Sequence, residues 1–364
     1  MSLSSLGTFF NYFLMYGIGF ILGSYGGLFS ESAGIINIAL EGAMALGAFF
    51  GVIFLQGMLS WCAGTFLVAT TGGLVITYLL AALVAIIAGI VFSFFLSFVA
   101  IKLRADQTVV GTALNTLVIA AASLINIATR PGEIPTQEVT TELFAQLLRI
   151  NTGNQFIDNM LSGLNFSVFV GLIAIIGLWL VYNKTRFGLR LRACGENPAA
   201  ADSVGINVYK MRYMGTAIGS AAAALGGFII FSCMPIGVWK INALGYGFLV
   251  LAIEIFGNWK ATNIIFCSLF FAFFFAFAPT FTAIISIHPE WGLNRNVFGQ
   301  RAFYYMLPYF LALLSLAIFS KKSRAPKAEG LPYDKSSRWY FKNSKIFNEN
   351  ILPLMVRYFR SKGE

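Results

Sequence analysis

The stretch "GIINIALEGAMALGAFFG", residues 34–51, decides the fold class of this chain. All of its residues are apolar or glycine except Asn37 and Glu41. About 20 apolar residues are needed to cross a bilayer as a helix, so the stretch predicts a membrane span. A carboxylate inside hydrocarbon is costly and usually faces a bundle interior or a water-filled path. We therefore expect Asn37 and Glu41 to have a structural or functional partner inside the protein.

The composition of the whole chain supports a membrane protein. Of the 364 residues, 58% are hydrophobic and only 11% are charged, whereas soluble proteins carry roughly a quarter charged residues. The fold class that we predict is an all-α integral membrane protein, a polytopic bundle of about ten transmembrane helices. A window of about 20 apolar residues gives ten candidate spans. They are residues 6–24, 34–57, 62–80, 82–101, 107–128, 165–183, 211–233, 244–257, 261–286 and 302–320.

Two of these boundaries depend on length alone. Residues 62–101 form one apolar run, which we divide near Leu80 into two spans. Residues 244–257 are short for a full crossing. The "GGLFSESAG" that precedes the second span, together with its glycines, predicts that this span has a broken or partly unwound start.

The basic residues predict the orientation. With the N-terminus inside, nine lysines and arginines fall in or beside cytoplasmic loops, and eleven fall in the tail, out of 25 in total. Such an excess is typical of the cytoplasmic side, so we expect both termini in the cytoplasm of a bacterial cell. The expected organisation is a transmembrane domain over 1–320, with an outer loop at 129–164 and a long cytoplasmic loop at 184–212. A basic cytoplasmic tail follows over 321–364 and suits anionic lipid rather than nucleic acid.

Enzyme sites find little support in the sequence. The single histidine, His288, stands beside a proline in an outer loop, and no Walker-type phosphate loop is present. The four cysteines are scattered without a C-x-x-C pair, which favours small apolar fillers over a metal site or disulfides. We therefore expect neither a catalytic centre nor a cofactor in this chain.

The cytoplasmic loop contains a short helix. In "ENPAAADSVGI", residues 196–206, Asn197 is a plausible N-cap, Pro198 suits the first helical position, and Gly205 suits the end. A helix with such a small-residue face can seat itself in a groove of another protein. The alternative is a solvated basic loop that only fixes the topology.

Five stretches resemble one family. "GENPAAADSVGINVYKMR" (195–212) is similar to the coupling region of membrane subunits in bacterial ABC importers for simple sugars, branched-chain amino acids and nucleosides. "GLFSESAGIINIALEGAMALGAFFG" (27–51) resembles the signature of the nucleoside branch, whose binding proteins are BMP-type lipoproteins. "LRADQTVVGTALNTL" (103–117), "GYGFLVLAIEIFGNWKATN" (245–263) and the outer loop ahead of the last span follow the same branch. The resemblance runs from about residue 25 to 335.

The resemblance implies a transport subunit with several partners. These are a second, homologous permease in a heterodimer, a cytoplasmic ABC ATPase that binds ATP and Mg, and an extracytoplasmic BMP-type lipoprotein. The helix within 195–206 would couple the permease to the ATPase. The residues implied in coupling are Gly195, Glu196, Asn197, Pro198, Ala200, Ala201, Gly205 and Ile206. Glu254 and Asn258 would support this side, although Glu254 also qualifies for the path.

Polar residues within the spans are candidates for the translocation path. Asn37 and Glu41 are four residues apart and share one helix face, and Thr112 and Asn115 form a second polar strip. Each has a structural alternative: Glu41 as a carboxylate that satisfies backbone donors at a helix start, and Asn115 as an interhelical hydrogen-bond partner. The G-x-x-x-G spacing at 19, 23 and 27 predicts close helix packing instead.

Three alternatives to a nucleoside importer remain open from the sequence. The first is an ABC importer for simple sugars. The second is a stand-alone proton-coupled secondary transporter that uses Glu41 as a proton site. The third is a purely structural or assembly membrane protein. Neither of the last two needs the helix in the long cytoplasmic loop.

Overall fold

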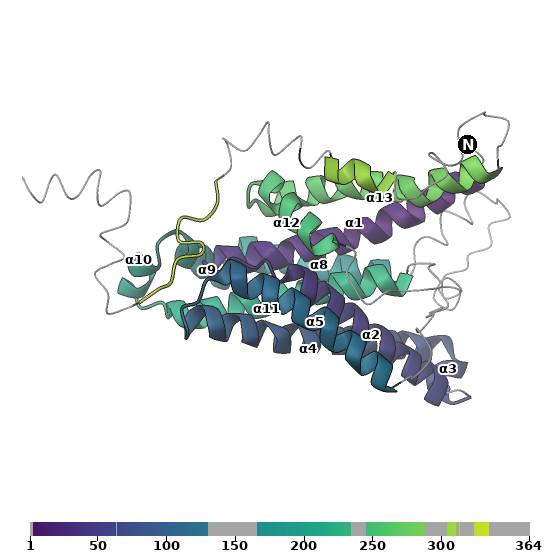
Figure 1. The fold of residues 1–364 in the computed structure, drawn as a ribbon, viewed down its shortest axis with the longest axis horizontal. Helices are drawn as coiled ribbons and strands as arrows, with labels where there is room; N and C mark the ends of the chain where they lie inside the picture. The colour runs from purple at the N-terminus through teal and green to yellow at the C-terminus, as the bar shows by residue number, and fades with distance from the viewer. Residues whose placement is uncertain are drawn as a thin grey trace, which may run out of the picture.

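The computed structural model describes residues 3–62, 64–129, 166–233, 245–287, 304–310, 313 and 324–334. Within these residues all regular structure is helical, and the long helices form one elongated bundle (Figure 1). The helices are α1 (Leu3–Ser32), α2 (Leu40–Trp61), α3 (Phe66–Ala69), α4 (Thr71–Ile101), α5 (Gln107–Thr129), α8 (Phe166–Lys184), α9 (Arg186–Glu196), α10 (Pro198–Ser203), α11 (Val208–Cys233), α12 (Tyr246–Gly257) and α13 (Ala261–Ile287).

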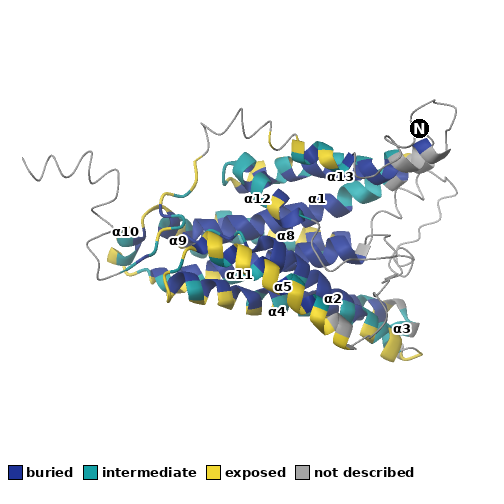
Figure 2. Ribbon diagram, viewed as in Figure 1, coloured by how far each residue is buried: buried dark blue, intermediate teal, exposed yellow. Residues whose placement is uncertain are grey.

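Helices α1 and α11 form the centre of the bundle, and most of their length is buried (Figure 2). Glycines let the two backbones approach closely. Of the predicted G-x-x-x-G set, Gly19 packs against α11, whereas Gly23 and Gly27 pack against α12. A Cβ atom on Gly219 would lie 2.3 Å from the carbonyl oxygen of Gly26, which is too close for any side chain. Close packing of small residues is the main source of helix association in a membrane, where water does not drive apolar surfaces together.

Seven helices in the described residues are long and apolar enough to cross a membrane, namely α1, α2, α4, α5, α8, α11 and α13. Helix α12 is apolar but has only 12 residues, about 18 Å, so it is too short to cross alone. The last predicted span, 302–320, is helical over 304–310 and lies largely outside the described residues.

The division near Leu80 is wrong. Helix α4 runs without interruption over 31 residues, and a separate short helix, α3, precedes it. No glycine, proline or charged residue stands between Ile76 and Ile87, so nothing in that segment favours a break. We divided the run because it exceeds the usual length of one span, but a longer helix can tilt or extend beyond the hydrocarbon.

Contacts of α1 show how the described ends of the chain are arranged. Ser32, the last residue of α1, contacts Gly195, and the carbonyl oxygen of Gly195 accepts a hydrogen bond from Ala328 N–H (2.8 Å). The end of α1 therefore lies beside residues 324–334, and Leu3 lies about 45 Å away at the other end of the bundle (Figure 1). The two described ends of the chain therefore lie at opposite ends of the bundle.

Other segments depart from the predicted bounds or cannot be compared. Helix α1 continues through "GGLFSES" to Ser32, and α2 begins at Leu40 instead of at residue 34. The loop 184–212 is itself mostly helical, because α9 and α10 lie within it. The outer loop 129–164, apart from Thr129, and the tail beyond 334 lie outside the described residues. Residues 324–334 form turns without a helix, as their polar, proline-containing sequence predicts.

Candidate functional site

Residues 33–39, which we call the α1–α2 segment, contain no helix and enter the bundle along α5. Its first three amides donate to carbonyl oxygens at the end of α1, and side chains of α5 bind the backbone that follows. Ile36 N–H donates to Oε1 of Gln107 (2.8 Å), and Nδ2 of Asn115 donates to the carbonyl oxygen of Ile38 (2.9 Å). Gln107 and Asn115 are eight residues apart, about 12 Å along the helix. These two side chains of α5 thus bind the non-helical backbone on either side of Asn37.

Asn37 lies inside this segment and is fully buried. Its Nδ2 atom donates to Oγ of Ser30 (3.0 Å), and its Oδ1 atom has no hydrogen-bond partner among the described residues. Glu41, in contrast, lies four residues further along the chain, in the first turn of α2. Its hydrogen-bond partners are at the start of α12. The two residues do not share a helix face, since α2 starts only at Leu40.

Glu41 binds the N-terminal end of α12. Gly245 N–H donates to its Oε1 atom (2.9 Å), and Gly247 N–H donates to its Oε2 atom (2.6 Å). Helix α12 has no side-chain cap of its own, so Glu41 satisfies amides that would otherwise be left without partners. A negative charge at a helix N-terminus is also favoured by the helix dipole. Glu41 thus satisfies backbone donors at a helix start, but the helix is α12 and not its own.

Asn115 and Thr112 lie on different faces of α5. Asn115 is buried, and its Oδ1 atom accepts from Gly42 N–H (2.7 Å) at the start of α2, where Ala39 offers no side-chain cap. Thr112 is exposed and returns its hydroxyl to the carbonyl oxygens of Thr108 and Val109. The two residues of the predicted polar strip therefore differ. Asn115 packs inside the bundle, and Thr112 lies on the outer face of α5.

The C-terminal end of α12 contains a second group of acidic side chains. Glu254, in the last turn, is fully buried, and its oxygens have no N–H or cationic partner among the described residues. Its carboxyl group interacts with that of Glu31 in α1. Glu31 also accepts from Nε1 of Trp259 (2.5 Å), and Glu329 lies near both carboxyl groups. The nearby Asn258 ends α12 with a positive φ of 53°.

The predicted short helix in the long loop is confirmed as α10. The Oδ1 atom of Asn197 caps it by accepting from Ala200 N–H (3.1 Å), and Pro198 occupies its first turn. Gly205 follows the helix with a φ of +83°, which a residue with a side chain rarely adopts. The local sequence therefore determines both ends of this helix.

The residues implied in coupling divide into two faces. Glu196, Asn197, Ala200 and Gly205 are exposed, whereas Gly195, Pro198 and Ala201 are buried, and Ile206 is half-buried. A Cβ atom on Gly195 would lie 2.4 Å from the Ser32 carbonyl oxygen, so this glycine permits α9 to pack on α1. The exposed face remains available to another protein. A cavity of about 940 Å³ opens beside it and is lined in part by Arg192, Lys260 and Arg324.

Several residues at these sites were not anticipated from the sequence. They are Glu31, Gln107, Arg212, Trp259 and residues 324–334. Glu31 and Arg212 carry a usable signal, because each is a charged residue at the edge of an apolar stretch. Residues 324–334 carry none beyond an irregular composition.

Comparison with known proteins supplies the family. The family profile described as branched-chain amino acid transport system / permease component matches residues 9–316. The guanosine ABC transporter permease protein NupQ of Bacillus subtilis is 37% identical over 330 residues, covering 89% of this chain and 96% of that protein. The nucleoside ABC transporter permease protein NupC of Lactococcus lactis is 34% identical, covering 89% and 95%.

A more distant relative has another name. The putative glucose ABC transporter permease protein TsgC13 of Haloferax volcanii is 27% identical and covers 67% of this chain and 69% of its own length. No solved structure matches the chain. The extent of the profile match and the identity to NupQ and NupC show that this chain belongs to the family of branched-chain amino acid transport system permease components.

Proposed function

We propose that this chain is the transmembrane permease subunit of an ATP-driven ABC importer that moves nucleosides into the cytoplasm. The observation that carries this proposal is the similarity over nearly the whole length to permeases named for guanosine and nucleosides. The exposed face of α10 supports it, because a stand-alone transporter has no use for a capped helix presented outside the bundle. ATP and Mg would bind to the partner ATPase, and this chain would contribute no catalytic group.

The end of the bundle that carries α9 and α10 would face the cytoplasm and the ATPase. The distribution of basic residues supports this side, since the first lysine or arginine of the chain is Lys102, in the turn between α4 and α5. The N-terminus would then lie outside, and residues 324–334 inside. The α1–α2 segment would be the unwound start of the second span, held by protein side chains instead of by lipid.

A second, homologous permease would complete the path. The outer face of α5 suits this contact, because only 22% of the residues in the apolar stretch of this helix are buried within this chain. Thr112 on that face would border the path, while Asn115 and Glu41 would hold α2 and α12 in place. An extracytoplasmic BMP-type lipoprotein would deliver the substrate on the opposite side. Glu254 and Asn258 would support the coupling side.

Uptake by the whole complex tests the substrate. We expect ATP-dependent uptake of labelled guanosine into vesicles, reduced by excess unlabelled nucleosides and unaffected by glucose or leucine. Competition by glucose would favour the sugar importer, for which TsgC13 is the specific support. Uptake by this chain without the ATPase, driven by a proton gradient, would favour a secondary transporter.

A variant on α10 tests the coupling role. Ala200→Trp places a bulky side chain on the exposed face, where it disturbs the contact with the ATPase but not the packing inside the bundle. We expect guanosine uptake to fall about ten-fold or more, while the chain still inserts and assembles. A substitution at the buried Gly195 is unsuitable, because it would also disturb α1. Unchanged uptake in the Ala200→Trp complex would contradict coupling through α10.

A further inference from the structure

Residues 324–334, which we call the strap, cross the end of the bundle beside α9 and α10 (Figure 1). The strap has no helix, so its backbone groups need partners elsewhere. Arg324 N–H donates to Oδ1 of Asn258 (2.7 Å) in the turn after α12, and Ala328 N–H donates to the carbonyl oxygen of Gly195 (2.8 Å). Ala328 is fully buried. The first half of the strap thus joins α12 to the end of α9.

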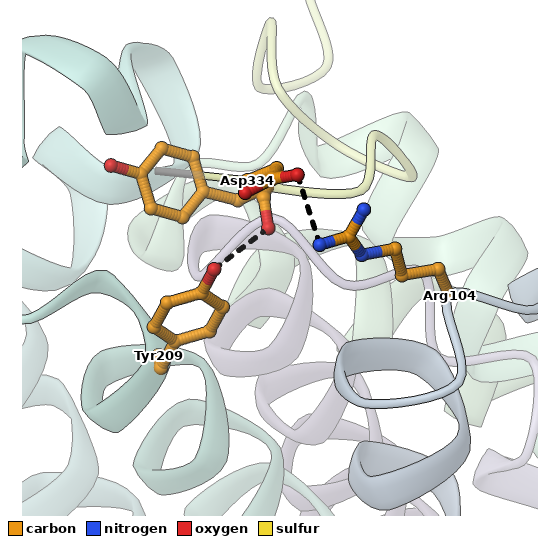
Figure 3. A network of polar contacts seen from close by, with 4 residues as sticks. Arg104, Tyr209 and Asp334 are labelled. Carbon is orange, nitrogen blue, oxygen red and sulfur yellow. Dashed lines mark hydrogen bonds and ion pairs between the residues drawn. The ribbon is translucent and has the colours of Figure 1, made fainter. Parts of the chain in front are cut away.

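The second half of the strap contacts α11 and the turn between α4 and α5. Nη2 of Arg212 donates to the carbonyl oxygen of Leu331 (2.9 Å). Figure 3 shows the end of this network: the Tyr209 hydroxyl donates to the carbonyl oxygen of Tyr333 (3.2 Å), and Asp334 pairs with Arg104 (3.0 Å). These contacts join residues more than 100 positions apart in the sequence.

The strap contacts α10 through Tyr333, which is only 5% exposed. Its side chain belongs to an apolar cluster with Ala201 of α10, Cys194 of α9 and Met211 of α11. Its hydroxyl lies beside the carboxylate of Asp202, also in α10, and burial followed by this carboxylate raises the pKa of Tyr333 to about 12. Tyr333 is therefore part of the surface against which α10 packs.

The strap also contacts the α1–α2 segment. A Cβ atom on Gly330 would lie 2.7 Å from Cδ1 of Ile36, and the carbonyl oxygen of Ala328 lies close to Gly34. On one side, the strap is therefore part of the surface against which α10 packs. On the other side it touches the backbone that leads into α2 and Glu41.

We propose that the strap is a positioning element for transport, which transmits displacement of α10 to the α1–α2 segment. This inference rests on the proposed coupling role of α10 and adds the element that lies between α10 and the path. Coupling between distant sites needs a contiguous set of packed and hydrogen-bonded groups, and the strap supplies one. Tyr333 is its main positioning residue, because its side chain is buried against α10, whereas the Arg104 side chain of the Arg104–Asp334 pair is 53% exposed.

The test compares uptake with ATP hydrolysis in the complete reconstituted complex. Tyr333→Ala removes the ring beneath α10, and Leu331→Ala is the matched control, since that side chain is 41% exposed. We expect Tyr333→Ala to lower the guanosine taken up per ATP hydrolysed by about three- to ten-fold. ATP hydrolysis itself should continue, whereas a merely structural role would reduce both rates together. Leu331→Ala should keep the wild-type ratio.

A charge exchange keeps the inference testable if Tyr333→Ala does not assemble. Arg104→Asp and Asp334→Arg each place like charges together at the end of the strap, and the double variant restores the pair with opposite signs. We expect each single variant to lower the uptake per ATP and the double variant to recover it. The inference would be overturned if Tyr333→Ala and both single charge variants assembled and kept the wild-type ratio of uptake to ATP hydrolysis.

The Ala200→Trp variant separates this failure from failure of the proposed function. If Ala200→Trp lowers uptake per ATP and the strap variants do not, α10 couples without the strap. If neither does, the coupling role of α10 is itself wrong.

Discussion

A buried carboxyl group lies at each end of α12, and the surroundings of the two groups differ. At the N-terminal end, Glu41 accepts two hydrogen bonds from the amides of Gly245 and Gly247. At the C-terminal end, Glu254 finds no amide or cation among the described residues, and its neighbour is the carboxyl group of Glu31. The helix dipole favours a negative charge at the first end and disfavours one at the second.

This difference separates a structural carboxylate from one that needs another explanation. Glu41 joins α2 to α12 through the amides of Gly245 and Gly247. Glu254 lies instead beside the strap residue Glu329, at the end of the bundle that we assign to coupling. Buried polar groups almost always have partners, and Glu254 has none but a second carboxyl group among the described residues.

The largest effect should follow loss of the Glu41 carboxylate. Glu41→Leu leaves the amides of Gly245 and Gly247 buried without acceptors, and we expect a loss of about 3 kcal/mol or more in stability. Glu41→Gln keeps one oxygen as an acceptor and should lose less. The midpoint of thermal unfolding in detergent measures both. Equal midpoints for wild type and Glu41→Leu would show that the cap is not needed.

The opposite sign is expected at Glu254. Glu254→Gln removes a buried acidic group that has no basic partner and offers an amide donor to Glu31. We expect the same midpoint to rise by about 2–4 °C, which corresponds to roughly 1 kcal/mol. Glu254→Ala is the control, because it removes the charge but leaves a cavity. A large fall in the midpoint of Glu254→Gln would mean that the carboxyl group is satisfied after all.

The sequence predicts local features of this protein better than contacts between distant segments. The limits of α10 follow from Asn197, Pro198 and Gly205, because a cap and a stop act within a few residues. The partners of Glu41 lie more than 200 positions away, and no pattern around residue 41 indicates them. A structural role could be considered from the sequence, but α12 could not be identified.

The same limit applies to the division near Leu80 and to the strap. A typical span length suggests a boundary at Leu80, although no residue there favours one, and α4 runs through that position without a break. The strap has the polar composition of an irregular segment, which predicts the absence of a helix but not where the segment docks. The strap forms most of its hydrogen bonds through its own backbone groups, which any sequence supplies.

The most local effect tests whether the C-terminal end of α12 responds to pH through the strap. Burial, followed by the charge of Glu31, raises the pKa of Glu329 to about 8. In an undocked strap, Glu329 would have its ordinary pKa of about 4.5. The docked state therefore holds its proton over a pH range in which the undocked state does not. Docking is strongest below about pH 4.5 and weakens as the pH rises from there to about 8.

Hydrogen exchange of a peptide that covers the strap measures this docking at pH 6 and pH 8. After correction for the intrinsic effect of pH on exchange, we expect the open fraction of the strap to be about 50-fold larger at pH 8. Glu329→Gln carries no charge at either pH, so its opening should be equally slow at both. Glu31 and Glu254 face Glu329 from α1 and α12. If the pH effect persists in Glu329→Gln, one of those two carboxyl groups controls the strap, and Glu254→Gln then decides between them.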